Sequence, residues 1–350
     1  MSSRQDQRAA EGAIAIQSQR DTIVHQGISS EDVRTIVESL ADQMPKLAAT
    51  AAAVMEVRLK AFEESIMKRF DEDAAAKRDA FSDPDFQYVV IEAQRAYART
   101  GDTETHGTLV DLIAKRSSEG TGSRRAFAIN EAITTISRLT RNEISELAFA
   151  FFSRFTQNFT VNNLTAFCAH LNTFIDELLD DLETDRQSYE YLVAQRCATI
   201  SMGEIRLIEI WRKVYPALFM KGFSAEKVDK IVGETSPDVK SLLIPSVFNP
   251  ACYQPRAMSL EVLLSMQRPP SVSVEHVQHI WAQAIADLAD DAAIVQKLKP
   301  QCPRIEEVID KWNSSPLKSL ELTTIGQAIG HARLTQIPSF GSPDLSIWIK

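Results

Sequence analysis

Apolar residues recur every three or four positions along most of this chain, and that spacing places them on one face of an α-helix. Glycine, which the many turns of an all-β protein require, accounts for only 12 of the 350 residues. Both features predict a mainly α-helical protein with a multi-helix bundle as its body. The clearest helical runs carry the apolar sets Leu109, Leu112 and Ile113; Ile129, Ile133 and Ile136; Ile144, Leu147, Phe151 and Phe155; and Leu164, Phe167, Leu171, Phe174 and Leu178.

The stretch of residues 12–27 differs from the rest of the chain. Ile14 and Ile16 alternate with small residues, as in a strand, and Ile23 and Val24 form a second short apolar pair. Two short strands alone are marginal in water, whereas copies from several chains would bury them together. We therefore interpret the stretch as a β-like oligomerisation segment, with an unstructured tail as the alternative.

A long helical arm is predicted after this segment. Ser29 or Ser30 can cap its start, and Pro45 interrupts its pattern, so we expect a kink or a break there. Its first apolar set is Val33, Ile36, Val37, Leu40, Met44 and Leu47.

A second run covers residues 47–76 and has a narrower apolar stripe. A narrow stripe suits a coiled coil with sister chains, but it also suits docking on the body of the same chain. The sequence leaves both possibilities open. The stripe consists of Val54, Leu59, Phe62, Ile66 and Phe70.

The pattern divides the chain into five regions. We expect a tail and oligomerisation segment at 1–27, the helical arm at 28–80, a central helical domain at 81–235, a proline-rich joint at 236–270 and a C-terminal unit at 271–350. In this last unit Leu320 to Thr323 is β-like, and the closing sequence DLSIWIK alternates as a strand does. Pairing of these two pieces predicts a small α+β cap that resembles a winged helix.

Charge and hydropathy narrow the classes of function. The formal net charge is −9, which disfavours binding to a phosphate backbone. The N-terminus lacks the apolar core of a secretory signal, and no apolar run approaches the roughly 20 residues of a membrane span. The four cysteines are far apart, which is typical of reduced thiols. We expect a soluble, cytoplasmic protein that does not bind membranes.

Two groups of residues could carry chemistry. His276 and His279 share a helix face and could touch one metal, and carboxylates from Asp176 to Asp185 could bind Mg²⁺ or act as acid and base. Solvated helix faces explain both groups more simply. Phosphate-binding glycine motifs and the nucleophile motif G-x-S-x-G do not occur. We therefore expect no metal or cofactor, and we identify no catalytic residue. The carboxylates are Asp176, Glu177, Asp180, Asp181, Glu183 and Asp185.

The block DPDFQYVVIEAQRAYARTGD at residues 83–102 resembles an uncharacterised bacterial protein family with the pattern DPDxQYxxxEAQxAYARTGD. Weaker similarities lie at GISSEDV (27–33), FMKGF (219–223), LTTIGQAIGHA (322–332) and the terminal SIWIK. The resemblance implies a gene found among bacterial accessory genes, including neighbourhoods linked to phage defence. It also implies a self-association device before the first helix. No catalytic residue can be transferred from it.

The sequence thus favours a homo-oligomeric interaction, sensor or scaffold protein, with a possible further protein partner and a role in antiviral defence. One alternative is a metal-dependent hydrolase that acts on nucleic acid or nucleotide. A third hypothesis is a membrane-active toxin whose amphipathic helices rearrange.

Overall fold

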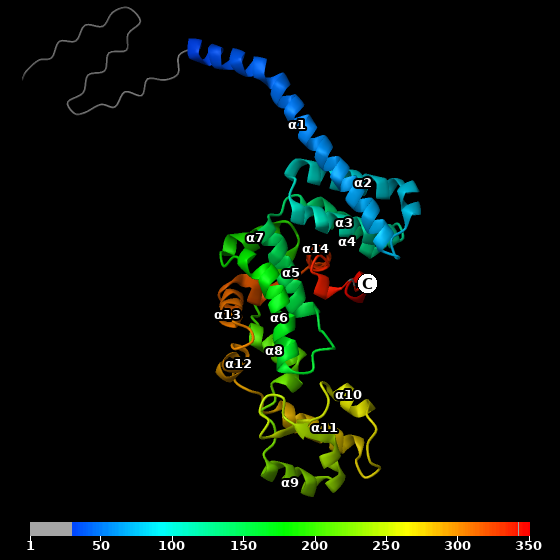
Figure 1. Cartoon of the computed structure of the whole chain (residues 1–350), viewed down its shortest axis with the longest axis vertical. Helices are drawn as coiled ribbons and strands as arrows, with labels where there is room; N and C mark the ends of the chain where they lie inside the picture. Colours follow the sequence, from blue (N-terminus) through cyan, green and yellow to red (C-terminus); the bar gives the residue numbers. More distant parts are fainter. Residues whose placement is uncertain (1–29, 342) are drawn as a thin grey trace, which may run out of the picture. The chain divides into compact units, whose positions relative to one another are not determined.

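The computed structural model describes residues 30–341 and 343–350, and it is mainly α-helical (Figure 1). The predicted fold class is therefore confirmed at the level of a mainly α protein. Contacts divide the chain into two units, Met1–Val54 and Met55–Lys350. Helix α1 (Ser30–Glu72) continues through Pro45, so of the kink or break predicted there the break does not occur. The oligomerisation segment at 12–27 lies outside the described residues.

The helices that follow α1 begin and end at residues suited to those positions. Asp83 caps α2 (Pro84–Thr100) by accepting a hydrogen bond from the Asp85 backbone, and Pro84 occupies the first helical position, where its missing N–H costs nothing. Gly101 ends α2 with a φ of 65°, a left-handed conformation that glycine adopts readily. Helix α2 and helix α3 (Thr103–Ser118) contact the C-terminal part of α1, and α4 (Arg124–Ile136) packs against α2 and α3.

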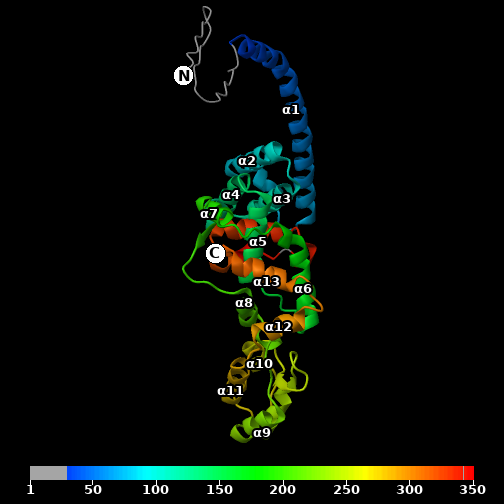
Figure 2. The same cartoon turned by 90° about the vertical axis from the view of Figure 1, so that its left-hand side faces the viewer.

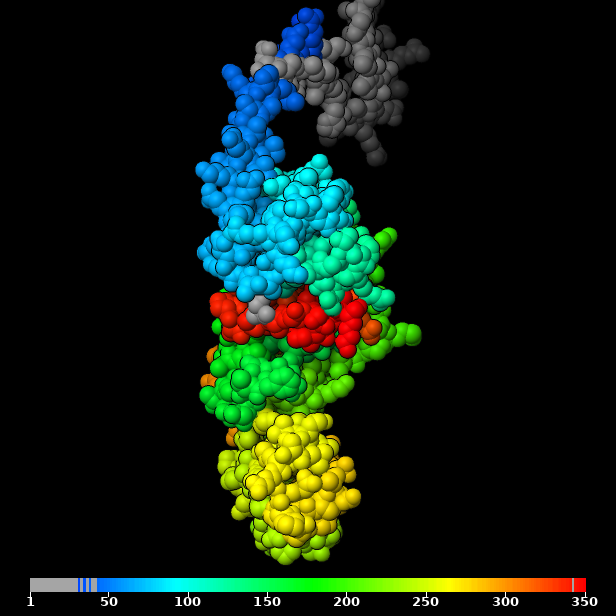
Figure 3. Space-filling view, turned by 90° about the vertical axis from the view of Figure 1, so that its right-hand side faces the viewer, coloured from blue at the N-terminus to red at the C-terminus, as the bar shows by residue number. Residues whose placement is uncertain are grey.

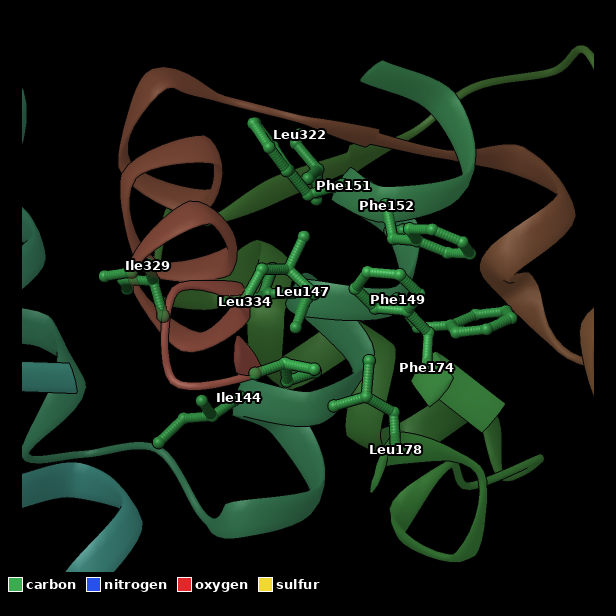
Figure 4. Packing of buried hydrophobic residues seen from close by; sticks show 14 of the residues in the cluster. Ile144, Leu147, Phe149, Phe151, Phe152, Phe174, Leu178, Leu322, Ile329 and Leu334 are labelled. Carbon is green, nitrogen blue, oxygen red and sulfur yellow. The ribbon is translucent and has the colours of Figure 1, made fainter. Parts of the chain in front are cut away.

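Helix α5 (Arg141–Phe155) forms the centre of the larger unit. One side contacts α6 (Leu164–Leu178), where the Phe152 and Phe174 rings stack at a centroid distance of 4.0 Å. Figure 4 shows Leu147 on the other side, beside Ile329 and Leu334 of α14 (Thr324–Leu334).

Glycines allow α14 to approach its neighbours closely. A Cβ atom at Gly330 would lie 2.6 Å from the Leu147 carbonyl oxygen, and one at Gly326 would clash with the Cys197 carbonyl. The helix therefore packs backbone against backbone. Figure 3 shows the C-terminal segment as a band between the residues of α2–α4 and those of α5 and α6.

The predicted strand pairing in the C-terminal cap is wrong. Strand β4 (Leu320–Leu322) pairs antiparallel with β1 (Ala198–Ile200), so its partner comes from the middle of the chain. The closing segment contains a 3-10 turn, η7 (Leu345–Ile347), in place of a strand. Leu345 and Ile349 are buried while Ile347 is exposed, and that four-residue spacing suits a helical turn rather than the alternation of a strand.

A second, smaller hydrophobic cluster lies at one end of the Met55–Lys350 unit (Figures 1 and 2). The proline-rich segment predicted as a joint contributes Val239, Leu242 and Leu263 to this cluster. Its elements are η3 (Pro216–Leu218), α9 (Ala225–Glu234), η4 (Pro237–Leu242), β2 (Leu243–Pro245), β3 (Tyr253–Pro255), α10 (Leu260–Ser265) and α11 (Val274–Ile285).

The remaining elements complete the main hydrophobic core or connect its helices. None of the helices in the described part of the chain combines the length and apolar character that a bilayer span requires. These elements are η1 (Arg78–Ser82), η2 (Leu179–Asp181), α7 (Arg186–Ala194), α8 (Leu207–Val214), α12 (Asp291–Leu298), α13 (Ile305–Ser314), η5 (Pro316–Ser319) and η6 (Pro338–Phe340).

Candidate functional site

Helix α1 presents a row of exposed apolar side chains before it reaches the core. Met44, Leu47, Ala51 and Val54 are separated by three, four and three residues, which is the spacing of the seam positions in a coiled coil. Met44 is 59% exposed, Leu47 55% and Val54 44%. We call these four residues the seam. The predicted oligomerisation residues Ile14, Ile16, Ile23 and Val24 lie outside the described residues, so the prediction for them stays open.

One face of the C-terminal half of α1 is buried in the main core. Phe62, Ile66 and Phe70 recur every four residues and are each at most 5% exposed. The Phe62 ring stacks on Tyr97 at 5.4 Å and contacts the His106 ring at the same centroid distance. Burial lowers the pKa of His106, so its ring is neutral at physiological pH. This half of α1 is therefore a structural element of the bundle.

The side chain of Arg58 connects α1 to the end of α2 through hydrogen bonds. Its guanidinium donates to the carbonyl of Ala98 at 2.8 Å and to that of Arg99 at 3.1 Å. Carbonyls in the last turn of a helix have no intrahelical partner and attract cations. The positive φ of Gly101 favours glycine there, whereas a shift of the flexible Arg58 side chain would relieve the close contact that a Cβ atom would make with its guanidinium.

A buried cluster of charges joins α1 to α3. Asp111, only 1% exposed, accepts from Arg69 at 2.9 Å and also pairs with Lys115, while Arg69 reaches Asp73 at 3.1 Å. Burial alone would raise the pKa of Asp111, but the charge and hydrogen bond of Lys115 and the charge of Arg69 outweigh burial and lower it. Asp111 is therefore a carboxylate, and the cluster is two acids balanced by two bases.

A polar groove of about 660 Å³ opens beside this cluster. Its walls come from α1, α3 and the residues after α14, and they include Lys68, Arg69, Glu72, His106 and Gln336. Opposite charges are balanced along the walls, and Arg69 is already paired. The Ser65 hydroxyl, which also lines the groove, donates to the Ala61 carbonyl. The Arg69–Asp111 ion pair beside the groove connects α1 to α3, and the groove has no excess of positive charge for an anion.

The pKa of a second buried carboxyl, that of Glu146 in α5, is shifted in the opposite direction. Burial raises the pKa of Glu146 to about 8, and its partners are the Ser188 hydroxyl, 2.9 Å away, and the Glu183 backbone N–H. These are neutral donors, so no cation compensates for the lost solvation. Glu146 is 0% exposed and cannot reach a substrate.

The predicted chemical groups are separated by the fold. His276 takes part in the N-terminal cap of α11, where its Nδ1 accepts from the Ser273 N–H, whereas His279 faces Glu234 at 3.5 Å. In the carboxylate run, Asp180 pairs with Arg304 and Asp181 pairs with Arg141 at 2.9 Å. Within residues 30–341 and 343–350, no group of three acidic, histidine or cysteine side chains is arranged to hold a metal.

Three of the four thiols are buried and unsuited to act as nucleophiles. Burial raises the pKa of Cys168 to about 11 and those of Cys197 and Cys302 to about 12, so these three remain protonated at physiological pH. All four cysteines are free thiols, as their spacing predicts.

The fold and these groups define a mainly helical protein in which one long helix has an exposed apolar seam and a buried half. One protein-family model matches residues 27–349. The chain therefore belongs to this family. The matched range includes the block at 83–102 that carries the resemblance. No curated protein and no solved structure matches the chain significantly.

Sequence reasoning missed the charged cluster and the spacing of the seam. Asp111 and Lys115 are four residues apart in a run otherwise rich in apolar residues, and such a pair signals a buried ion pair only when its helix is known to be covered on all sides. The spacing of the seam could have been recognised from the sequence, because the intervals between Met44, Leu47, Ala51 and Val54 are visible there.

Proposed function

We propose that this protein is a homo-oligomeric interaction protein that self-associates through the seam of α1. The observation that carries the proposal is the alternation of three and four residues between Met44, Leu47, Ala51 and Val54, whose large side chains are exposed on the single chain. Such spacing keeps one stripe facing a partner helix over successive turns. Exposed apolar residues in a contiguous stripe are typical of an interaction surface.

A second copy of the same chain is the occupant that best suits this surface. The stripe is self-complementary in size, since it combines large residues with the small Ala51, and α1 is 43 residues long. Isolated helices draw little stability from propensity alone, so a helix of this length needs a packed apolar face. Association of two or more copies supplies that face.

The test is the solution mass of the full-length protein, measured by light scattering after size exclusion, for the native chain and for the double variant Leu47→Glu/Val54→Glu. We expect an oligomer that becomes a monomer in the double variant, because burying a leucine-sized side chain contributes about 1.5–3 kcal/mol. The matched control is Val57→Glu, which alters a 71% exposed residue of the same helix outside the seam.

Retention of the native mass in Val57→Glu and its loss in the double variant support the proposal. A native chain that is monomeric, or a double variant that keeps the native mass, contradicts it. A truncated chain that starts at Ile28 separates this seam from the segment at 12–27. If the truncated chain alone becomes monomeric, the first segment drives assembly.

The role in phage defence belongs to the same proposal and is supported by the sequence resemblance alone. We expect cells that express the native chain to reduce plaque formation by a susceptible phage. The Leu47→Glu/Val54→Glu variant should lose this protection, whereas Val57→Glu should keep it. Protection that persists in the double variant would separate defence from assembly.

A further inference from the structure

A hollow of about 780 Å³ lies between the loop that joins α5 to α6 and the residues that follow α14. Small-molecule sites commonly have volumes of roughly 300–1,000 Å³. We call this hollow the aromatic pocket, because its walls are rich in rings. Its ring-bearing residues are Phe155, Phe159, His170, Phe340 and Trp348.

One wall of the aromatic pocket is a turn in which the side chain of a phenylalanine is exposed to solvent. Phe159 is 86% exposed. The turn is fixed by Asn158, whose side-chain oxygen accepts from the Thr160 backbone at 2.9 Å and whose backbone N–H donates to the Tyr215 hydroxyl at 2.8 Å. An apolar ring held in solvent by a hydrogen-bonded turn is available to a ligand without a large rearrangement.

The opposite wall is fixed in a similar way. The indole N–H of Trp348 donates to the Phe155 carbonyl at 2.8 Å, and its ring meets Phe151 edge-on at 4.9 Å. Phe340 makes edge contacts with Phe174 and His331. Ile347, which is 60% exposed, adds a second apolar side chain to the lining. Both walls are therefore preformed, and both carry apolar surface that water covers in the free protein.

The electrostatics of the aromatic pocket differ from those of the polar groove. None of the described residues that line it is a lysine, arginine, aspartate or glutamate. Burial lowers the pKa of His170 to about 4, so its imidazole is uncharged at physiological pH. The uncharged polar side chains of the lining, apart from His170, are those of Thr156, Gln157, Asn158, Thr160 and Ser339. Such walls offer stacking surfaces and a few neutral hydrogen-bonding groups, and nothing that would compensate a charged ligand.

We propose that the aromatic pocket binds a neutral small molecule with a flat aromatic ring, held between the Phe159 turn and the segment of Phe340 and Trp348. This inference is independent of the self-association proposed above, because none of the seam residues lines the pocket.

The test uses N-phenyl-1-naphthylamine, a neutral aromatic dye whose fluorescence rises on binding. We expect saturable binding of one dye per native chain, with energy transfer from tryptophan because Trp348 lines the pocket. Phe159→Ser should weaken binding about tenfold, because it removes one of the aromatic rings on which the dye would stack. The matched control is Phe127→Ser, which removes a 60% exposed phenylalanine of α4 that does not line the pocket.

Phe127→Ser should bind the dye as the native chain does. Equal weakening in both variants, or unchanged binding in Phe159→Ser, would overturn the proposal. Leu47→Glu/Val54→Glu should also bind normally, and loss of dye binding in that variant would place the dye on the seam instead. An anionic naphthalene sulfonate should bind at least several-fold more weakly than the neutral dye, and equal affinity would contradict the proposed ligand class.

Discussion

The two halves of α1 differ in how their apolar residues are spaced, although they belong to one continuous helix. In the buried half, Phe62, Ile66 and Phe70 recur every four residues, whereas the seam alternates between three and four. Rows four residues apart form the ridges that pack against inclined helices of a globular core. Alternation of three and four follows a parallel or antiparallel partner along its length. The spacing, rather than the amount of apolar surface, thus distinguishes the helix face that the chain buries from the exposed face that we propose for a partner.

The largest expected effect concerns the buried half. Phe62→Ala should lower the free energy of unfolding by about 3–5 kcal/mol, because it removes a fully buried ring and leaves a cavity against Tyr97 and His106. Chemical denaturation of the full-length protein measures this loss. A cost below about 1 kcal/mol would mean that this half of α1 is not part of the core, and the contrast between the halves would fail.

Asp111→Asn should have the next largest effect, a loss of about 3 kcal/mol at neutral pH, because it leaves the charges of Arg69 and Lys115 without their carboxylate in a buried site. The pKa of Asp111 is lowered in the folded protein, so the stability it contributes is present above the ordinary value of 3.8 and is lost as the pH falls through the folded-state pKa.

The pH dependence checks the electrostatic origin of this effect. The difference in stability between the native chain and Asp111→Asn should shrink below about pH 4, as the pH falls towards the folded-state pKa of the native carboxylate. A difference that stays constant down to about pH 2 would indicate a packing effect instead. Denaturant titrations at several pH values provide the measurement.

Arg58→Ala tests the junction between the two halves, and we expect a loss of about 1–2 kcal/mol, because the variant removes two hydrogen bonds from a cation to the last carbonyls of α2. Lys60→Ala, at an exposed position two residues away, is the matched control and should change stability by less than about 0.5 kcal/mol. Equal effects in the two variants would show that the contacts of Arg58 contribute nothing specific.

The smallest effect is expected in the seam itself. Leu47→Ala should leave the unfolding free energy of the Met55–Lys350 unit within about 0.5 kcal/mol of the native value, because the side chain is exposed on the single chain. Thermal unfolding followed at concentrations above and below the association midpoint separates this local effect from the loss of assembly. A large loss at high dilution would assign Leu47 to the core of its own chain.

The sequence predicts the helices well where caps and spacing agree. Asp83, Pro84 and Gly101 place both ends of α2, and the apolar sets of α3 to α6 identify helices that the structure contains. Tertiary contacts decide the rest. The alternation in DLSIWIK suits a strand, yet the Trp348 indole binds the Phe155 carbonyl and the segment turns.

The buried charged groups were not predicted for a related reason. The pKa values of Asp111 and Glu146 depend on whether cations face these carboxyls. Arg69 of another helix faces Asp111, whereas no cation among the described residues faces Glu146. The aromatic pocket likewise combines residues near 155–170 with residues near 340–348, a juxtaposition that no local pattern predicts.

The backbone contact between α14 and α5 has a consequence for synthesis of the protein. Helix α5 is complete at Phe155, but the helix whose Gly330 lies against Leu147 ends only at Leu334. At about 5–20 residues per second, the ribosome needs roughly 10–40 s to make the intervening chain. During that interval the apolar face of α5 that α14 later covers is exposed. We therefore expect chaperones that recognise apolar segments to bind nascent chains stalled before residue 324 more strongly than completed chains.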